Sequence, residues 1–195
     1  VVMTKKALKI AWTHHGDYFR LALENWRGIR QLKEEHDALQ TQLGHDSKGD
    51  DDIAGQLAHR NDAIGELALV VIVFCAFALE AFINDYAISR LSRNYLSKYL
   101  DKLDVVAKWM VIPRLVSRKG LDPGSRPLQD VAWLVELRNR LAHYKSKELT
   151  IDQITVSDFL WYEDAERAIR AVTGAVLALG RLDRKAQTDW IRTEA

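Results

Sequence analysis

The chain has 195 residues and a mass of 22.3 kDa, and its residues are 48% hydrophobic and 28% charged. This composition excludes wholesale disorder and is sufficient for one domain with a buried core. The formal net charge is only +1, but residues 89–147 carry 13 basic and 5 acidic side chains, and both flanking regions are net negative. A basic segment favours polyanions such as RNA or DNA, although solvated helix faces would give the same count.

The first predicted helix covers residues 16–44. Apolar residues such as Phe19 and Leu23 recur at steps of three and four, and Gly44 is a typical residue for the end of a helix. The polar stretch 45–52 is predicted to be a loop. Its last residues are aspartates, which favour the positive end of a following helix.

The second predicted helix covers residues 53–98, with Gly65 as a point where it can break. Its centre, residues 67–83, is almost entirely apolar. A membrane span is the obvious alternative, but this stretch is at the short limit for a bilayer and contains Glu80. We therefore expect a central helix that its neighbours bury on most sides, and no membrane.

Three further helices are predicted, over residues 101–118, 125–147 and 157–192. Pro127 lies in the first turn of the second of these, and Ser157 can cap the last. The sequence shows no internal repeat and no change of composition that would divide it. About five helices joined by short polar links predict an all-α fold, an antiparallel helical bundle.

Cysteine and histidine usage bears on the compartment and on metals. The single cysteine, Cys75, lies in an apolar run and cannot form an internal disulfide. We interpret it as a small core residue, and we expect a reducing, cytoplasmic location. Most histidines are scattered without acidic or cysteine companions at ligand spacing, so no metal and no cofactor are expected.

The fourth predicted helix combines an arginine, an asparagine and a histidine. In helical register Arg138 falls inside an apolar stripe, between Val135 and Ala142. A permanent charge there costs several kcal/mol unless a partner or a ligand compensates it. His143 lies about 140° around the helix from Arg138, so the two side chains flank a groove or the helix bends between them. Asn139 and His143, four residues apart, share one face.

An arginine and a histidine in this arrangement suit the cleavage of a phosphodiester. An imidazole can move a proton to or from an oxygen near neutral pH. A guanidinium offers a planar fork of donors to phosphate oxygens as negative charge builds on them. The alternative is structural: Arg138 pairs with a carboxylate in the core, and His143 merely ends the helix.

The string R-N-R-L-A-H, residues 138–143, resembles the signature of the HEPN superfamily, in which an arginine and a polar residue precede a histidine. The segment FALEAFIND, residues 77–85, is similar to the long central helix of HEPN proteins, which often carries a glutamate. The resemblance covers roughly residues 53–180 of a single all-α domain, 1–195, to which the N-terminal helix 16–44 is added.

This resemblance implies a metal-independent endoribonuclease that works as a homodimer, in which two Arg–His motifs meet in one composite cleft. The ribose 2′-hydroxyl attacks the adjacent phosphate and leaves a cyclic phosphate end. On this chain Arg138 would stabilise the phosphate, His143 would transfer protons and Asn139 would support them. Family context adds a toxin or defence setting and an antitoxin or regulatory protein as a partner. Toxin-type members place a tyrosine two positions after the histidine, where this chain has Lys145, so that role is not carried over.

Further residues are assigned from the same hypothesis. Four cations are predicted to contact RNA: Arg126, Arg140, Lys145 and Lys147. Glu80 is predicted to orient Arg138 or His143 across the bundle. The alternative for Glu80 is a carboxylate held by the backbone or another basic group, or one that faces solvent. Two alternative functions stay open: a non-catalytic HEPN-like bundle that binds nucleic acid or a protein, and a purely structural dimerising bundle.

Overall fold

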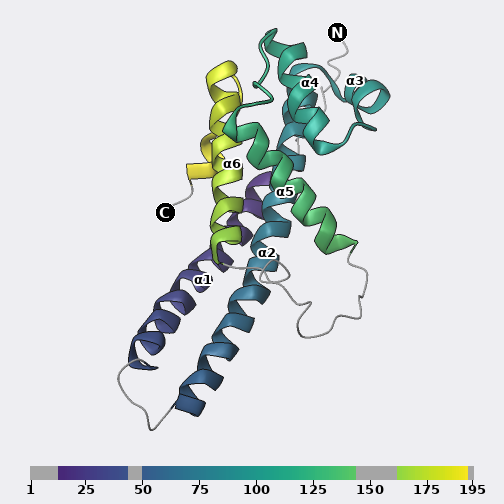
Figure 1. The fold of residues 1–195 in the computed structure, drawn as a ribbon. Coiled ribbons are helices and arrows are strands. Elements are labelled where there is room, and N and C mark those ends of the chain that lie inside the picture. The colour runs from purple at the N-terminus through teal and green to yellow at the C-terminus, as the bar shows by residue number, and fades with distance from the viewer. Residues whose placement is uncertain (1–12, 44–49, 144–161, 193–195) are drawn as a thin grey trace, which may run out of the picture.

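The computed structural model describes residues 13–43, 50–143 and 162–192, and all secondary structure in these segments is helical (Figure 1). Within them, six α-helices follow one another: α1 (His15–Leu43), α2 (Asp50–Arg90), α3 (Arg93–Tyr95), α4 (Val105–Ser117), α5 (Arg126–Ala142) and α6 (Tyr162–Leu182). A π-helix, η1 (Leu96–Leu100), follows α3, and a 3₁₀-helix, η4 (Asp189–Arg192), follows α6. The all-α prediction is confirmed for this part of the chain.

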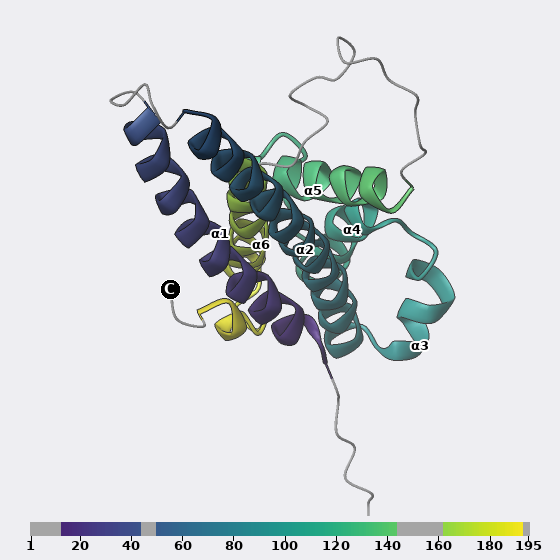
Figure 2. The ribbon, with the colours of Figure 1, turned by 90° about the horizontal axis from the view of Figure 1, so that it is seen from below.

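α1 and α2 run antiparallel and form a long hairpin whose far end projects beyond the other helices (Figures 1 and 2). α1 agrees with the predicted helix to within one residue at each end, and it buries Phe19, Ala22 and Ile29 in the core. Towards the projecting end the two helices are joined by a polar contact, Arg60 Nε to Glu35 Oε2 at 3.4 Å. The hairpin therefore contributes to the core mainly through its other half.

α2 is the longest helix, and Gly65 does not interrupt it. The completely buried residues of its apolar stretch include Val71, Ile72, Cys75 and Leu79. The opposite side leaves Leu69 and Phe77 exposed, by 45% and 37%. Among the described residues, α2 is the one helix that is long and apolar enough to cross a membrane, and 50% of its apolar window is buried inside the protein. The expectation that its neighbours bury it on most sides is therefore confirmed in part: half of this window is buried, and within residues 67–83 Leu69 and Phe77 are exposed.

The structure has a sixth α-helix because α2 ends at Arg90, eight residues before the predicted end. Ser92 has φ 136° and ψ 158°, a conformation that cannot continue a helix and that residues with a side chain rarely adopt. Its Oγ accepts a hydrogen bond from the backbone N–H of Tyr95 at 3.2 Å. The same serine thus separates α2 from α3 and caps α3.

α4 begins four residues later than predicted because Asp104 caps it. The Asp104 Oδ1 atom accepts a hydrogen bond from the backbone N–H of Ala107 at 2.9 Å, which satisfies a donor of the first turn. At the other end Arg118 takes a left-handed conformation, with φ 60°, and this closes the helix.

The boundaries of α5 and α6 match the predictions in part. Pro127 lies in the first turn of α5, as expected. α5 ends at Ala142 instead of continuing to 147, and residues 144–147 lie outside the described residues. α6 ends at Leu182, ten residues before the predicted end, and the predicted cap Ser157 also lies outside the described residues.

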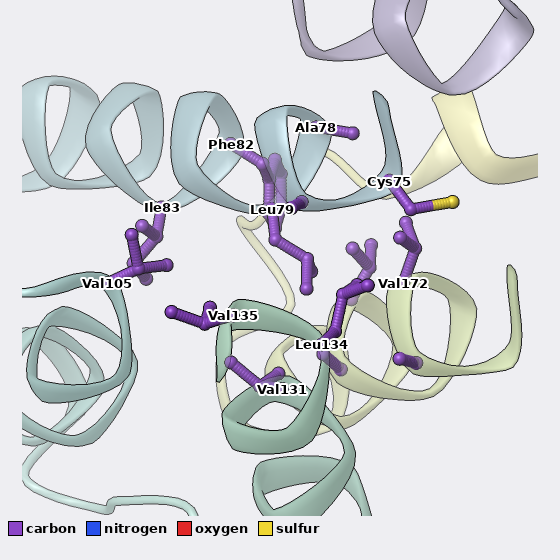
Figure 3. Close-up of a cluster of buried hydrophobic side chains, with 14 of the residues drawn as sticks. Cys75, Ala78, Leu79, Phe82, Ile83, Val105, Val131, Leu134, Val135 and Val172 are labelled. Carbon is purple, nitrogen blue, oxygen red and sulfur yellow. The ribbon is translucent and has the colours of Figure 1, made fainter. Parts of the chain in front are cut away.

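The core forms where α2, α4, α5 and α6 meet (Figure 3). The side chains in it include Leu79 and Ile83 of α2, Val105 of α4, Val131 and Leu134 of α5, and Val172 of α6. Trp109 is fully buried beside them, and its indole Nε1 donates a hydrogen bond to the Leu79 carbonyl at 3.3 Å. This packing holds α5 next to α2, and it therefore determines which side chains of α5 reach α2.

Candidate active site around Arg138 and His143

Arg138 lies on the side of α5 that faces α2. Its Nη2 is 3.4 Å from Oε2 of Glu80, and the two side chains are 22% and 38% exposed. A charge-assisted hydrogen bond between nitrogen and oxygen is typically about 2.7–2.9 Å long, so this contact is loose. Arg138 Nε is buried and has no hydrogen-bond partner among the described residues. Its own subunit therefore satisfies this guanidinium only in part.

Glu80 and Asn84 lie four residues apart on α2 and form a polar spot on an otherwise apolar helix. The Asn84 Oδ1 atom is buried and has no partner in the described part of the chain. The structure brings Glu80 and Arg138 together, as the hypothesis of an orienting carboxylate requires. The same contact also fits the alternative of a carboxylate held by a basic group, so the catalytic role of Glu80 stays a prediction.

His143 is the residue at which α5 ends. Its backbone N–H donates to the Asn139 carbonyl at 3.0 Å, and its φ of −113° departs from the helical value. The imidazole is exposed and lines an open groove of about 540 Å³ between α5 and the start of α4. We call this the α4–α5 groove. The residues that line it include Asp104, Val106, Glu136, Asn139, Arg140 and His143.

The predicted site residues fall into two groups. Asn139 and His143 line the same groove, as their spacing predicts, and Arg140 joins them. Arg138 is not part of that groove, because its side chain extends towards α2. The angular separation expected between Arg138 and His143 is therefore present: among the described residues, the α4–α5 groove is lined by His143 and not by Arg138.

The predicted RNA contacts other than Arg140 do not join the site. Arg126 lies at the opposite end of α5, roughly 18 Å along the helix axis from Arg138. Its side chain is 80% exposed, and its Nε is 3.5 Å from Oδ2 of Asp130. Lys145 and Lys147 lie outside the described residues.

Two carboxylates of the α4–α5 groove were not anticipated from the sequence. Glu136 is exposed three residues before Asn139 and seven before His143, so helical register alone could have placed it on their face. Asp104 reaches the groove from the start of α4, and only the packing of α4 against α5 puts it there. Both carboxylates reduce the positive charge around His143.

Carboxylates from outside residues 89–147 neutralise part of the positive charge of this basic segment. Arg138 is paired with Glu80, and Arg90 Nε lies 2.9 Å from Oδ2 of Asp183. Lys108 is only 4% exposed. The charge excess in the sequence therefore overstates the positive charge that the surface of this segment presents.

The described residues contain no group of three or more histidine, cysteine or acidic side chains that could hold a metal ion. Cys75 is fully buried in the core, and burial raises the pKa of its thiol well above the ordinary value. Its interpretation as a core residue and not as a nucleophile agrees with this environment.

No protein-family model matches this chain, and neither a curated protein nor a solved structure is matched by it. The fold and the candidate site therefore define the protein only as follows: the secondary structure of the described residues is helical, and an arginine, an asparagine and a histidine lie in the last turns of α5. The HEPN resemblance rests on residues 138–143 and 77–85 alone.

Proposed function

We propose that this chain is a metal-independent endoribonuclease of the HEPN type, a cytoplasmic toxin or defence effector that cleaves RNA as a homodimer. The observation that carries the proposal is the arrangement of two side chains in the last turns of α5. Arg138 contacts Glu80, but its buried Nε has no partner among the described residues, and His143 is exposed one and a half turns further on. A partly satisfied guanidinium near an exposed imidazole suits an anionic substrate.

Two copies are needed because Arg138 and His143 of one copy face different sides of α5. A two-fold axis beside α5 would bring equivalent residues of both copies into one cleft. In that cleft the ribose 2′-oxygen forms a bond to phosphorus while the bond from phosphorus to the 5′-oxygen breaks. Arg138 stabilises the negative charge on the phosphate, and His143 moves a proton to or from the reacting oxygens. Asn139 supports His143, and Arg140 contacts the RNA backbone.

The proposal predicts cleavage of single-stranded RNA in the presence of EDTA, with cyclic phosphate ends among the products. Arg138→Ala and His143→Ala should each lower the cleavage rate at least about a hundredfold, because each removes a group that acts in the transition state. Matched controls are Arg170→Ala on α6 and His59→Ala on α2. Each removes an arginine or a histidine side chain at an exposed position outside α5. Rates that stay at the wild-type value in both site variants would contradict the catalytic assignment.

A second candidate function is favoured by the contact between Arg138 and Glu80. This contact gives the arginine a carboxylate partner in the apolar stripe and requires no substrate, although it leaves Nε without a partner among the described residues. Under this reading the protein is a non-catalytic bundle that binds nucleic acid or a protein. RNA that stays intact after long incubation, but whose binding weakens with rising salt, would favour binding without catalysis.

A further inference from the structure

A second cavity lies where α1 begins and α2 ends, and it shares no lining residue with the α4–α5 groove. Figure 2 shows the start of α1, the end of α2 and η4 gathered at this end of the molecule. The cavity has a volume of about 570 Å³, which is in the range of sites for small ligands such as nucleotides. We call it the His15 pocket. Its polar wall includes His15, Asp85, Ser89, Arg90, Arg93 and Lys185.

The His15 pocket presents more positive than negative charge. Arg90, Arg93 and Lys185 line it, whereas Asp85 is the one carboxylate among its lining residues. Arg90 donates from Nε to Asp183, which leaves its terminal nitrogens for other acceptors. Arg93 and Lys185 are exposed, and neither forms an ion pair with a carboxylate of the described residues. The cavity is thus suited to an anion.

The one carboxylate of the pocket is already engaged by a buried histidine. His15 is 8% exposed, and its Nδ1 lies 2.9 Å from Oδ2 of Asp85. The imidazole packs edge-on against Phe82 and Trp190, with ring centroids 5.4 and 4.8 Å away. A carboxylate can only accept, so Nδ1 donates, and this hydrogen bond occupies Oδ2 of Asp85. The pair therefore leaves the basic side chains of the pocket without a competing free carboxylate among its lining residues.

We propose that the His15 pocket binds a phosphomonoester, carried either by a small metabolite or by the 5′ end of an RNA. A phosphomonoester has up to two negative charges and three terminal oxygens, which match several donors at once. Arg93 and Lys185 supply the charge, Arg90 donates hydrogen bonds from its terminal nitrogens, and His15 occupies the Asp85 carboxylate. This site does not depend on the proposed ribonuclease function, because no residue is shared between them.

Calorimetric titration of the full chain tests this assignment. The probes are inorganic phosphate, AMP and a 2′-O-methyl RNA oligonucleotide with or without a 5′-phosphate. The 2′-O-methyl group removes the attacking hydroxyl, so binding is measured whether or not the protein cleaves RNA. We expect saturable binding of the phosphate-bearing probes that weakens at least about tenfold when Arg93→Gln and Lys185→Gln are combined.

The matched control combines Lys98→Gln and Arg184→Gln, which removes the same charge from neighbouring positions that do not line the pocket. Binding of phosphate and AMP would identify a small ligand, whereas binding of the 5′-phosphorylated RNA alone would identify an RNA end. Equal weakening in both double variants, or no preference for a terminal phosphate, would overturn the proposal. Thermal unfolding of every variant confirms that the fold is retained.

Discussion

Asp183, the residue that follows α6, ties this end of the helix to α2. Its Oδ2 accepts hydrogen bonds from the Tyr86 hydroxyl and from Arg90 Nε, both at 2.9 Å, and its Oδ1 accepts from the Lys185 backbone N–H at 3.0 Å. Burial alone would raise the pKa of Asp183, but these hydrogen bonds and the charge of Arg90 outweigh it and lower the pKa below 3.8. Burial and the hydrogen bond to Asp183 raise the pKa of Tyr86.

Asp183→Asn should therefore reduce the free energy of unfolding by about 1–3 kcal/mol at neutral pH. The pKa of Asp183 is lower in the folded than in the unfolded protein, so its ionised form stabilises the fold. This stabilisation is complete above the pKa of the unfolded state, and it is lost as the pH falls through the pKa of the folded state. The difference between wild type and variant should accordingly shrink below about pH 4. Urea unfolding at a series of pH values measures this, with Asp189→Asn as the control because that side chain is 91% exposed. A difference that is constant down to strongly acidic pH would contradict the prediction.

The residues of the candidate site were predictable to different degrees. Arg138, Asn139 and His143 follow from one short string and from helical spacing, and their two directions on α5 agree with that spacing. Asp104 could not be placed, because its position depends on how α4 packs against α5. The contact between Arg90 and Asp183 could not be predicted, because no pattern in one sequence indicates which residues that far apart come together.

At the scale of elements, the order of the long helices and the starts of α1, α2 and α5, which lie within three residues of the predicted ones, follow from apolar periodicity and turn residues. The ends were less predictable. Ser92 stops α2 through an unfavourable backbone conformation that only tertiary packing can maintain, and intrinsic propensity does not report it. Gly65 shows the opposite case: it is a point where the helix could break, and α2 continues through it, with apolar residues buried further along the helix.

Two glycines of α6 offer a test of helix packing. A Cβ at Gly174 would meet no atom within 4 Å, whereas a Cβ at Gly180 would lie 2.9 Å from Thr188 Cγ2. Gly174→Ala should raise the free energy of unfolding by about 0.5–1 kcal/mol, because alanine loses less backbone entropy in a helix. Gly180→Ala should give a smaller gain or a loss, since Thr188 must shift. Paired thermal unfolding curves compare the two, and equal effects would show that the contact with Thr188 does not constrain the helix.

At the scale of the whole molecule, the proposed function requires a second copy. α2 leaves part of its apolar surface uncovered at Leu69 and Phe77, so one copy does not bury all the apolar surface of its most apolar helix. Arg138 and His143 also lie on different sides of α5, so the proposed cleft would draw on two chains. Both features are compatible with association of two copies, and neither identifies the surface that they share.

Sedimentation of the purified chain at micromolar concentration should therefore give twice the 22.3 kDa of one copy. His143→Ala should leave this mass unchanged while it removes cleavage, which separates assembly from chemistry. If RNA drives the pairing, the doubled mass should appear only when a non-cleavable RNA is added. A particle with the mass of a single copy under both conditions would contradict a composite cleft.

The buried position of Cys75 has a practical consequence for that question. The chain contains no other cysteine, and the Cys75 sulfur is enclosed in the core with a raised pKa, so thiol reagents should leave the native protein unmodified. A cysteine introduced on an exposed helix would then carry a spin label or a dye as the sole reactive position. Distances between labels on two associated chains could map their relative orientation without first removing the natural thiol.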